Sequence, residues 1–191
     1  ATPDGGTTNY YYDNIGRIVA SQNAKQAAMT GSVYSYTFYD AQGRVYEVGQ
    51  VACTTAISST VTATMSAWTA YVAAGTRTEV TSTYYDATLN STVQNTFFGG
   101  QNYLRKRVTS VTIEKTYDGN SATYDHATHF SYDVHGNVNE LIQEYPELVD
   151  HNQRYKHICY EYDLISGNVN LVMYNHNPYN GNTYGDQFYN K

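Results

Sequence analysis

The sequence predicts an all-β protein made of repeated antiparallel β-hairpins. Tyrosine occupies 22 of the 191 positions, against 5 for phenylalanine and 1 for tryptophan, and the remainder is rich in Thr, Asn, Val and Ser. These residue types favour strands and turns. Seven of the ten aspartates directly follow a tyrosine, where about one such pair is expected by chance, so the Tyr-Asp pair belongs to a repeated unit.

The full unit reads Tyr-Asp-x-x-Gly, followed by Arg or Asn and an aliphatic residue. Three regular copies carry the key residues at Tyr12, Asp13 and Gly16, at Tyr39, Asp40 and Gly43, and at Tyr132, Asp133 and Gly136. A fourth copy, with Tyr162, Asp163 and Gly167, has one extra loop residue. The spacing between copies is irregular, which indicates a degenerate array.

Each part of this unit has a role in a tight hairpin. Aspartate at the first position of a type I turn accepts a hydrogen bond from the backbone two residues on, and glycine takes the left-handed conformation. This combination is the common turn that ends in a G1 bulge. Before the turn, tyrosines alternate at the period of two that a strand requires, as Tyr10 and Tyr12 do. One hairpin is barely stable, so neighbouring hairpins are expected to cover one another in a sheet.

Several segments depart from the unit. Tyr85-Asp86 lacks the glycine, although Asn90 can tolerate a left-handed conformation, and we expect a decayed copy with a longer loop there. Tyr117-Asp118-Gly119 and Tyr124-Asp125 read as irregular turns. Residues 52–83 form an insertion rich in Ala, Thr and Ser.

Within this insertion, the helical spacing of Met65, Trp68 and Val72 predicts a short amphipathic helix near residues 62–74. Its expected role is to cover the sheet with Trp68.

The whole chain, 1–191, is expected to be a single array. Both of its ends read as repeat units without polar caps, although arrays of repeats need such caps for solubility. We therefore expect a segment of a longer polypeptide, or a protomer that stacks on copies of itself.

Charge and cysteine content exclude several classes. The net charge is −6, and Lys and Arg together number only 11, so no basic surface for nucleic acid or an anionic membrane is expected. No stretch is long and apolar enough to span a membrane. Cys53 and Cys159 fit no metal or redox spacing, and the sequence leaves open whether they pair.

No catalytic residue, cofactor site or metal site is predicted. Nucleotide-binding and nucleophile motifs are absent from the sequence. His126 and His129 would point to opposite faces of a strand, and no third ligand is evident. Asn90-Ser91-Thr92 is a sequon that makes Asn90 a candidate glycosylation site.

These units resemble the YD repeats of the Rhs and YD-repeat superfamily, which includes bacterial polymorphic toxins, shell subunits of insecticidal toxin complexes and teneurins. The resemblance covers nearly the whole chain and is most specific in 38–51, 124–145 and 160–173, which are similar to Rhs proteins of Bacteroidetes-like bacteria. It implies a sheet that spirals into a hollow shell, which encloses a toxic domain in toxin members, and an extracellular or cell-surface setting. The Asp-Pro-x-Gly signature of the family's self-cleaving core has no match, so autoproteolysis is not expected.

The expected function is structural, as a wall segment of a shell or of a surface fibre, and not enzymatic. The expected partners are other repeats of the same polypeptide, copies of the chain, or an enclosed toxin domain. The alternative is a carbohydrate-binding or adhesive module that stacks exposed Tyr and Trp rings on sugars.

Overall fold

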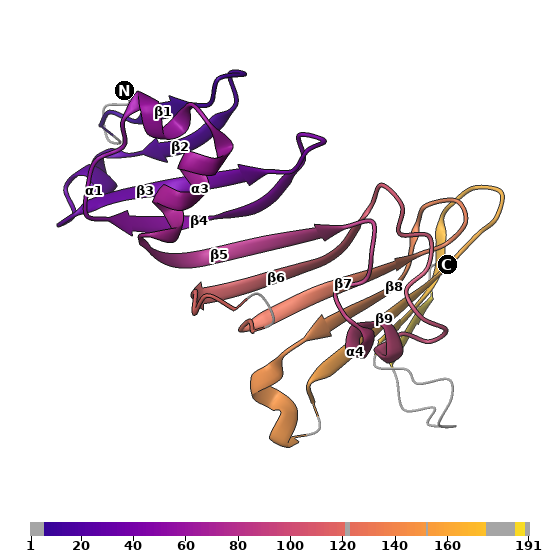
Figure 1. Cartoon of the computed structure of the whole chain (residues 1–191). Coiled ribbons are helices and arrows are strands. Elements are labelled where there is room, and N and C mark those ends of the chain that lie inside the picture. The colour runs from indigo at the N-terminus through magenta and orange to yellow at the C-terminus, as the bar shows by residue number, and fades with distance from the viewer. Residues whose placement is uncertain (1–5, 121–122, 152, 175–185, 190–191) are drawn as a thin grey trace. The chain divides into compact units, whose positions relative to one another are not determined.

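The structure is a computed structural model that describes residues 6–120, 123–151, 153–174 and 186–189. It confirms the all-β class and the hairpin character. Among the described residues, eleven strands form one sheet in the order of the sequence, so each strand is hydrogen-bonded to its neighbours along the chain. Figure 1 labels most of these strands. Such a meander results when each strand pairs with the next one along the chain.

The strands have the following bounds: β1 (Asn9–Tyr12), β2 (Ile18–Gln22), β3 (Ser32–Tyr39), β4 (Val45–Cys53), β5 (Thr76–Tyr85), β6 (Val108–Thr116), β7 (His126–Tyr132), β8 (Val138–Glu144), β9 (Tyr155–Tyr162), β10 (Val169–Tyr174) and β11 (Asp186–Tyr189). The helices are α1 (Ala24–Ala27), α2 (Ser59–Thr62), α3 (Met65–Ala73), α4 (Ser91–Thr96) and the 3-10 helix η1 (Pro146–His151).

The chain divides into two compact units, where the sequence predicted one array. Unit 1 comprises Ala1–Ser82 and Ile113–Thr123, and unit 2 comprises Thr83–Thr112 and Tyr124–Lys191. The division falls within β5 and β6. Each unit has its own buried cluster of side chains, which explains the division.

Unit 1 has an apolar core beneath α3, which lies where the sequence predicted a helix. Thr64 caps the helix by accepting a hydrogen bond from the Ala67 backbone N–H. Trp68 is 0% exposed, and its indole N–H donates to the Thr37 carbonyl. Tyr36 and Phe38 of β3 belong to the same buried cluster. The helix therefore covers the sheet of this unit, as expected.

The segment between β4 and β5 is shorter than the predicted insertion of 52–83. The strand β4 extends to Cys53 and β5 begins at Thr76, so the connection comprises only 54–75. Residues 76–83 belong to β5, where Thr76 lies opposite Ala52 and Ser82 lies opposite Glu47. Thr in particular suits a paired strand, which explains why these residues extend β5.

Unit 2 buries a smaller apolar cluster under α4. Val93 and Phe97 pack on Ile142 of β8, and Leu89 and Tyr155 lie at the edge of this cluster. Polar side chains, among them Ser110, His129 and Glu144, are also buried in this unit.

Both cysteines are free thiols. Burial raises the pKa of the Cys159 thiol to about 12, so it is unreactive at neutral pH. Among the helices of the described residues, none has the length and apolar character needed to cross a membrane.

Candidate functional site

The Tyr12 copy of the unit forms a turn closed by its aspartate. The Asp13 N–H donates to the Arg17 carbonyl at 3.0 Å, and the Gly16 N–H donates to the Asp13 carbonyl at 3.1 Å. The Asp13 Oδ1 accepts from the N–H groups of Ile15 and Arg17. Gly16 has φ 83°, and the strand register shifts between Tyr11 and Tyr12, as a G1 bulge requires.

The other three copies are built in the same way. The N–H groups of Asp40, Asp133 and Asp163 donate to carbonyls of Arg44, Asn137 and Asn168, respectively. The glycines that follow, Gly43, Gly136 and Gly167, have φ of 80°, 100° and 71°. All twelve residues that the sequence singled out therefore lie at or beside four turns with a common pattern of bonds.

Hydrogen bonds within the turns stabilise the charged form of these aspartates. Burial alone would raise the pKa of the Asp13 carboxyl, but hydrogen bonds from Arg17 and Ile15 outweigh it and hold the pKa below its usual value. The pKa of Asp163 is lowered by hydrogen bonds from Ser166, first of all from its backbone N–H. The turns are thus formed best by ionised aspartates.

The residue after the glycine divides the copies into two kinds. The Arg17 Nε donates to Asp13 Oδ2 at 2.8 Å, and the Arg44 Nε to Asp40 Oδ2 at 2.7 Å. The Asp133 Oδ2 instead accepts from the neutral amide of Asn137 at 3.0 Å. The fourth copy has Asn168 in this place. Two turns therefore contain a guanidinium and two do not.

Successive hairpins are joined by the hydroxyl of the repeated tyrosine. This hydroxyl donates to the backbone carbonyl of the first residue of the preceding strand. The three observed bonds run from Tyr39 to Ile18 at 2.8 Å, from Tyr132 to Val108 at 2.6 Å, and from Tyr162 to Val138 at 2.8 Å. We call these three bonds the tyrosine links.

An arginine accompanies two of the tyrosine links. The guanidinium of Arg17 lies 4.5 Å from the centre of the Tyr39 ring, and that of Arg107 lies 5.2 Å from the Tyr132 ring. Both distances allow cation–π attraction. In the third link, the residue that corresponds to these arginines is Asn137.

The Tyr85-Asp86 copy is a turn with a long loop inside it. The Asp86 N–H donates to the Arg107 carbonyl at 3.2 Å, and the Asp86 carboxylate accepts from the Lys106 N–H. Lys106 has φ 61° and stands directly before Arg107, so it takes the place of the glycine. Residues 87–106 are therefore inserted in a turn that still closes at its base.

Asn90, which could tolerate a left-handed conformation, has an extended backbone instead. Its φ is −162°, and its side chain caps α4 by accepting from the Val93 N–H. A helix cap is a favourable place for Asn, and this capping explains the difference. Asn90 is exposed, and nothing in the structure tests its glycosylation.

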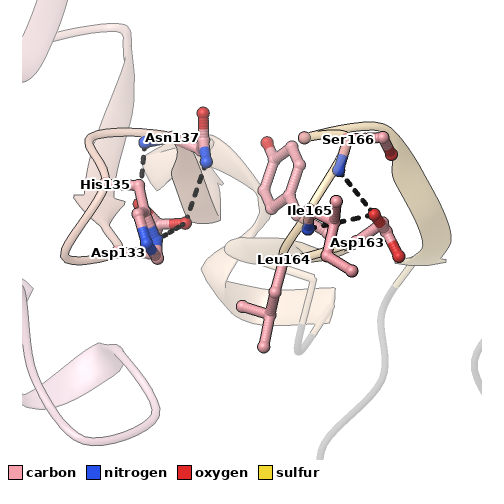
Figure 2. Close-up of a pocket in the computed structure, with 9 residues that line it drawn as sticks. Asp133, His135, Asn137, Asp163, Leu164, Ile165 and Ser166 are labelled. Carbon is pink, nitrogen blue, oxygen red and sulfur yellow. Dashed lines mark hydrogen bonds and ion pairs between the residues drawn. The ribbon is translucent and has the colours of Figure 1, made fainter.

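A pocket of about 240 Å³ lies between the third and fourth turns (Figure 2). Asp133 and Asn137 contribute to it from one turn, and Tyr162, Asp163 and Ile165 from the next. Ile165 is 98% exposed, so an apolar side chain stands free at the rim.

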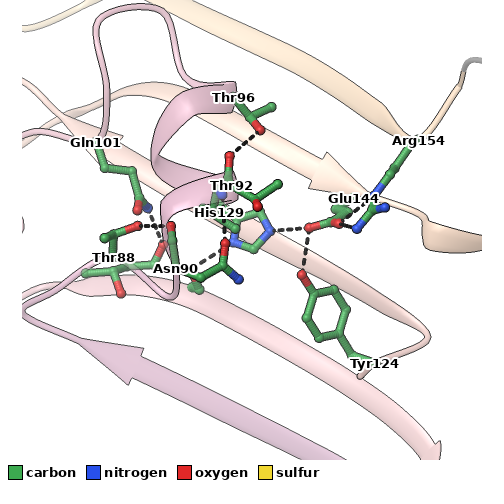
Figure 3. Close-up of polar contacts among 12 residues, drawn as sticks. Thr88, Asn90, Thr92, Thr96, Gln101, Tyr124, His129, Glu144 and Arg154 are labelled. Atoms are coloured by element: carbon green, nitrogen blue, oxygen red, sulfur yellow. Dashed lines mark hydrogen bonds and ion pairs between the residues drawn. The ribbon is translucent and has the colours of Figure 1, made fainter. Parts of the chain in front are cut away.

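A second polar site lies buried under α4 in unit 2. The Glu144 carboxylate accepts from His129 Nε2 at 2.9 Å, from the Tyr124 hydroxyl at 2.8 Å and from Arg154 Nε at 2.8 Å (Figure 3). The Ser110 Oγ lies 2.8 Å from His129 Nδ1. The His129 ring therefore bridges the Ser110 hydroxyl and the Glu144 carboxylate through its two nitrogens. We call these five residues the Glu144 network.

Several donors hold Glu144 in its charged form. Burial would raise the pKa of this carboxyl, but hydrogen bonds from His129, Arg154 and Tyr124 lower it to about 2. The same hydrogen bond and burial raise the pKa of Tyr124, with burial the larger cause. Glu144 is therefore an ionised acceptor at any physiological pH.

The order of hydroxyl, imidazole and carboxylate is the one used in nucleophilic catalysis. Here Ser110 is 0%, His129 1% and Glu144 0% exposed. All three side chains are buried beneath the inserted loop in this structure. The hydrogen bonds from Ser110 to His129 and from His129 to Glu144 hold β6, β7 and β8 together.

The inserted loop supplies the cover over this face. The Phe98 N–H donates to the Glu140 carboxylate, and the Phe98 ring stacks on His157 at 4.7 Å. The Gln101 side-chain amide donates to the carbonyls of Thr109 and Phe130. The loop is thus hydrogen-bonded to β6, β7 and β8.

Sequence reasoning missed the Glu144 network. His129 was considered only as a metal ligand, and within the described ranges no group of three or more His, Cys, Asp or Glu side chains is suited to a metal ion. A signal was present in β8, where Glu140, Ile142 and Glu144 alternate with outward residues. This period of two would place both acids on the face of a buried apolar residue.

Comparisons with known proteins identify no family for this chain. No family model matches the chain, and no curated protein matches it. Among solved structures, the chain is similar to a Tc holotoxin pore of Photorhabdus luminescens, with 13% sequence identity and a TM-score of 0.23. The match covers 91% of this chain and 9% of that one, so the chain spans about a tenth of the length of the similar structure.

Proposed function

We propose that this chain is a structural β-scaffold of the YD-repeat type: a wall segment of an Rhs-type shell or of a surface fibre, in a secreted or cell-surface protein. Its partners in this role are further hairpins of the same kind, with an enclosed polypeptide as the cargo of a shell. The proposal assigns it no catalytic step and no cofactor.

The observation that carries the proposal is the recurrence of one bonded turn and one tyrosine link. Each turn closes a hairpin with its own aspartate, and each link ties a hairpin to the one before it. Since the hairpins at Tyr39, Tyr132 and Tyr162 supply both parts, further hairpins could be added without a new kind of contact. Such a design suits an extended wall.

The burial of candidate reactive groups is consistent with this role. Ser110 and His129 lie under the inserted loop, and their hydrogen bonds hold strands together. Buried polar networks whose members are all hydrogen-bonded rigidify a structure.

Electron cryo-microscopy of the natural polypeptide that contains this chain tests the proposal. We expect strands of this segment to be continuous with a larger sheet that encloses a space or forms a fibre. The protein should be found in the medium or at the cell surface by fractionation. The wall would be contradicted if the segment formed an isolated module in which no further strand pairs with β1 or β11.

Protease protection provides a matched test. Wild-type polypeptide should protect any enclosed segment from added protease, whereas Trp68→Ala should expose it by weakening unit 1. Tyr10→Phe, which changes an exposed side chain, serves as the control and should protect as well as the wild type. Equal cleavage of the enclosed segment in all three proteins would argue against a shell.

A carbohydrate-binding module is the second candidate function. Tyr10 and Tyr12 stand on one face of β1 and are 54% and 51% exposed, as stacking on sugar rings requires. Trp68 is fully buried, so it can take no part in such a site. Binding to a glycan array that is lost in Tyr10→Ser/Tyr12→Ser, with the fold retained, would support this function. A glycan array without any binding signal would contradict this second function.

A further inference from the structure

The pocket between the third and fourth turns occupies a position that a guanidinium fills elsewhere in the chain. Arg17 follows the glycine of the first turn, pairs with Asp13 at 2.8 Å and lies 4.5 Å from the ring of Tyr39, the tyrosine of the next turn. Arg107 stands over Tyr132 in the same relation. An arginine between two successive turns is thus a recurrent part of this fold.

At the third turn the arginine is replaced by Asn137. The shorter side chain reaches Asp133 Oδ2 at 3.0 Å, and the space above Tyr162 becomes part of the pocket. Tyr162 keeps its tyrosine link to Val138 at 2.8 Å, so its ring is held as Tyr39 is. The ring and the carboxylate that hold Arg17 therefore have counterparts here, without the cation.

The pocket also has a second carboxylate directed to no cation. Both hydrogen bonds to Asp163 from the Ile165 and Ser166 N–H groups end on Oδ1. The Ser166 side chain also hydrogen-bonds the Asp163 carboxylate, so its donors named here are all uncharged. His135 Nδ1 lies 3.9 Å from Asp133 Oδ2 and is mostly exposed. The pocket is therefore lined by two carboxylates, those of Asp133 and Asp163.

We infer that this pocket binds the guanidinium of an arginine side chain presented by a partner polypeptide. The planar cation would stack on Tyr162 and donate to Asp133 and Asp163, as Arg17 does to Tyr39 and Asp13. The exposed Leu164 and Ile165 at the rim would contact the aliphatic stem of that arginine. A pocket of about 240 Å³ is smaller than most small-molecule sites, and suits one side chain.

This inference is independent of the proposed wall. A segment of any role could present such a pocket, and a wall could be built without it. Binding of arginine and enclosure of a cargo are therefore separate outcomes.

Titration of the full chain with N-acetyl-arginine amide, followed by ¹⁵N NMR, tests the inference. We expect saturable shift changes at Gly136, Ser166 and Gly167, with a dissociation constant on the order of 1–10 mM for so exposed a site. N-acetyl-citrulline amide, which has the same shape but no charge, should bind at least about fivefold more weakly. An arginine-containing peptide should bind at least as tightly as the amide.

The variant Asn137→Arg provides the decisive control. Its new side chain should occupy the pocket from within, abolish the shift changes, and raise Tm. Asn14→Arg adds the same charge at an exposed position of another turn and should leave binding unchanged. If Asn137→Arg fails to fold, Asp163→Asn should weaken binding without altering the buried core.

Three outcomes would overturn the site. Equal binding of the citrulline derivative would show that the charge is not recognised. Undiminished binding by Asn137→Arg, or by Asp163→Asn where Asn137→Arg does not fold, would place the ligand elsewhere. Shift changes that are scattered over the acidic surface and do not saturate would indicate screening of the net charge only.

Discussion

At the scale of single residues, the Glu144 network shows how a charged carboxylate is accommodated in a buried position. A buried carboxylate is costly unless donors surround it. Glu144 has donors from three side chains: His129 on β7, Tyr124 just before β7 and Arg154 just before β9. The charge is therefore compensated, and removal of the carboxylate would leave those donors without an acceptor.

Glu144→Gln is expected to lower the free energy of unfolding by about 3 kcal/mol, because breaking one partner of a buried ion pair leaves an uncompensated charge. Urea denaturation followed by circular dichroism measures the loss. Glu147→Gln, at an exposed position nearby, is the matched control and should change stability by less than about 0.5 kcal/mol. Equal effects of both variants would show that the network contributes nothing specific.

The pH dependence of stability follows from the same residue. The pKa of Glu144 is about 2 in the folded chain and 4.5 in the unfolded one. A carboxyl with a lowered pKa contributes stability above its unfolded pKa, and this contribution is lost as the pH falls through the folded pKa. Unfolding free energy should thus decrease by about 3 kcal/mol between pH 5 and pH 2 on account of Glu144.

Acid titration of the two proteins separates this contribution from others. Lowered pKa values are also found in the turn aspartates Asp13, Asp40, Asp133 and Asp163. Their protonation at low pH should therefore destabilise the fold as well. The wild type should therefore lose more stability than Glu144→Gln over this range. Parallel curves for the two proteins would contradict the assignment to Glu144.

At the scale of elements, hairpins are joined by backbone pairing and by the tyrosine links. Each link places the tyrosine hydroxyl of one strand against the first backbone carbonyl of the preceding strand. The link therefore fixes where the neighbouring hairpin begins. Register in a sheet is otherwise set by the hydrophobic pattern and the turn. In strands with many polar residues, a bond of this kind adds a constraint that the pattern does not provide.

Tyr162→Phe is expected to destabilise the chain by about 1 kcal/mol, because the Val138 carbonyl loses its donor while the ring remains. Tyr132→Phe should act similarly through Val108. Tyr10→Phe, whose hydroxyl is at an exposed position, is the control and should have almost no effect. Chemical denaturation measures all three, and a loss in the control as large as in Tyr162→Phe would refute the role of the links.

The elements differ in how far the sequence could predict them. The hairpins and the bulged turns were predictable, since Asp and Gly act within five residues. The helix α3 was predictable for the same reason, from Trp68 and its helical neighbours. The Glu144 network depends on which residues of β6, β7 and β8 lie opposite one another, and on a loop that folds over them, and local patterns do not specify that register.

At the scale of the whole molecule, the chain has two buried clusters of different character. Unit 1 is held by aromatic packing around Trp68, and unit 2 by polar networks with a small apolar cluster around Ile142. The sequence suggested one uniform array because the turns recur in both. The division was not predictable, since it depends on the separate segments 54–75 and 87–106 that cover the two units.

Hydrogen exchange should report the two units separately. Trp68→Ala removes a fully buried ring and should cost about 3–5 kcal/mol. We expect amide protection to fall in β3 and β4 while β8 and β9 are affected little, and the reverse for Glu144→Gln. Mass spectrometry of exchanged peptides measures both patterns. Uniform loss of protection in both variants would show a single cooperative unit instead.

The turn at Asp86 has a consequence for how such chains acquire new parts. Its base is closed by bonds between Asp86 and the pair Lys106 and Arg107, whatever lies between them. A foreign loop can therefore be inserted within this turn while the strands on either side keep their register. Because each of the other turns closes at its base in the same way, each is a further position at which a binding loop could be grafted onto this sheet.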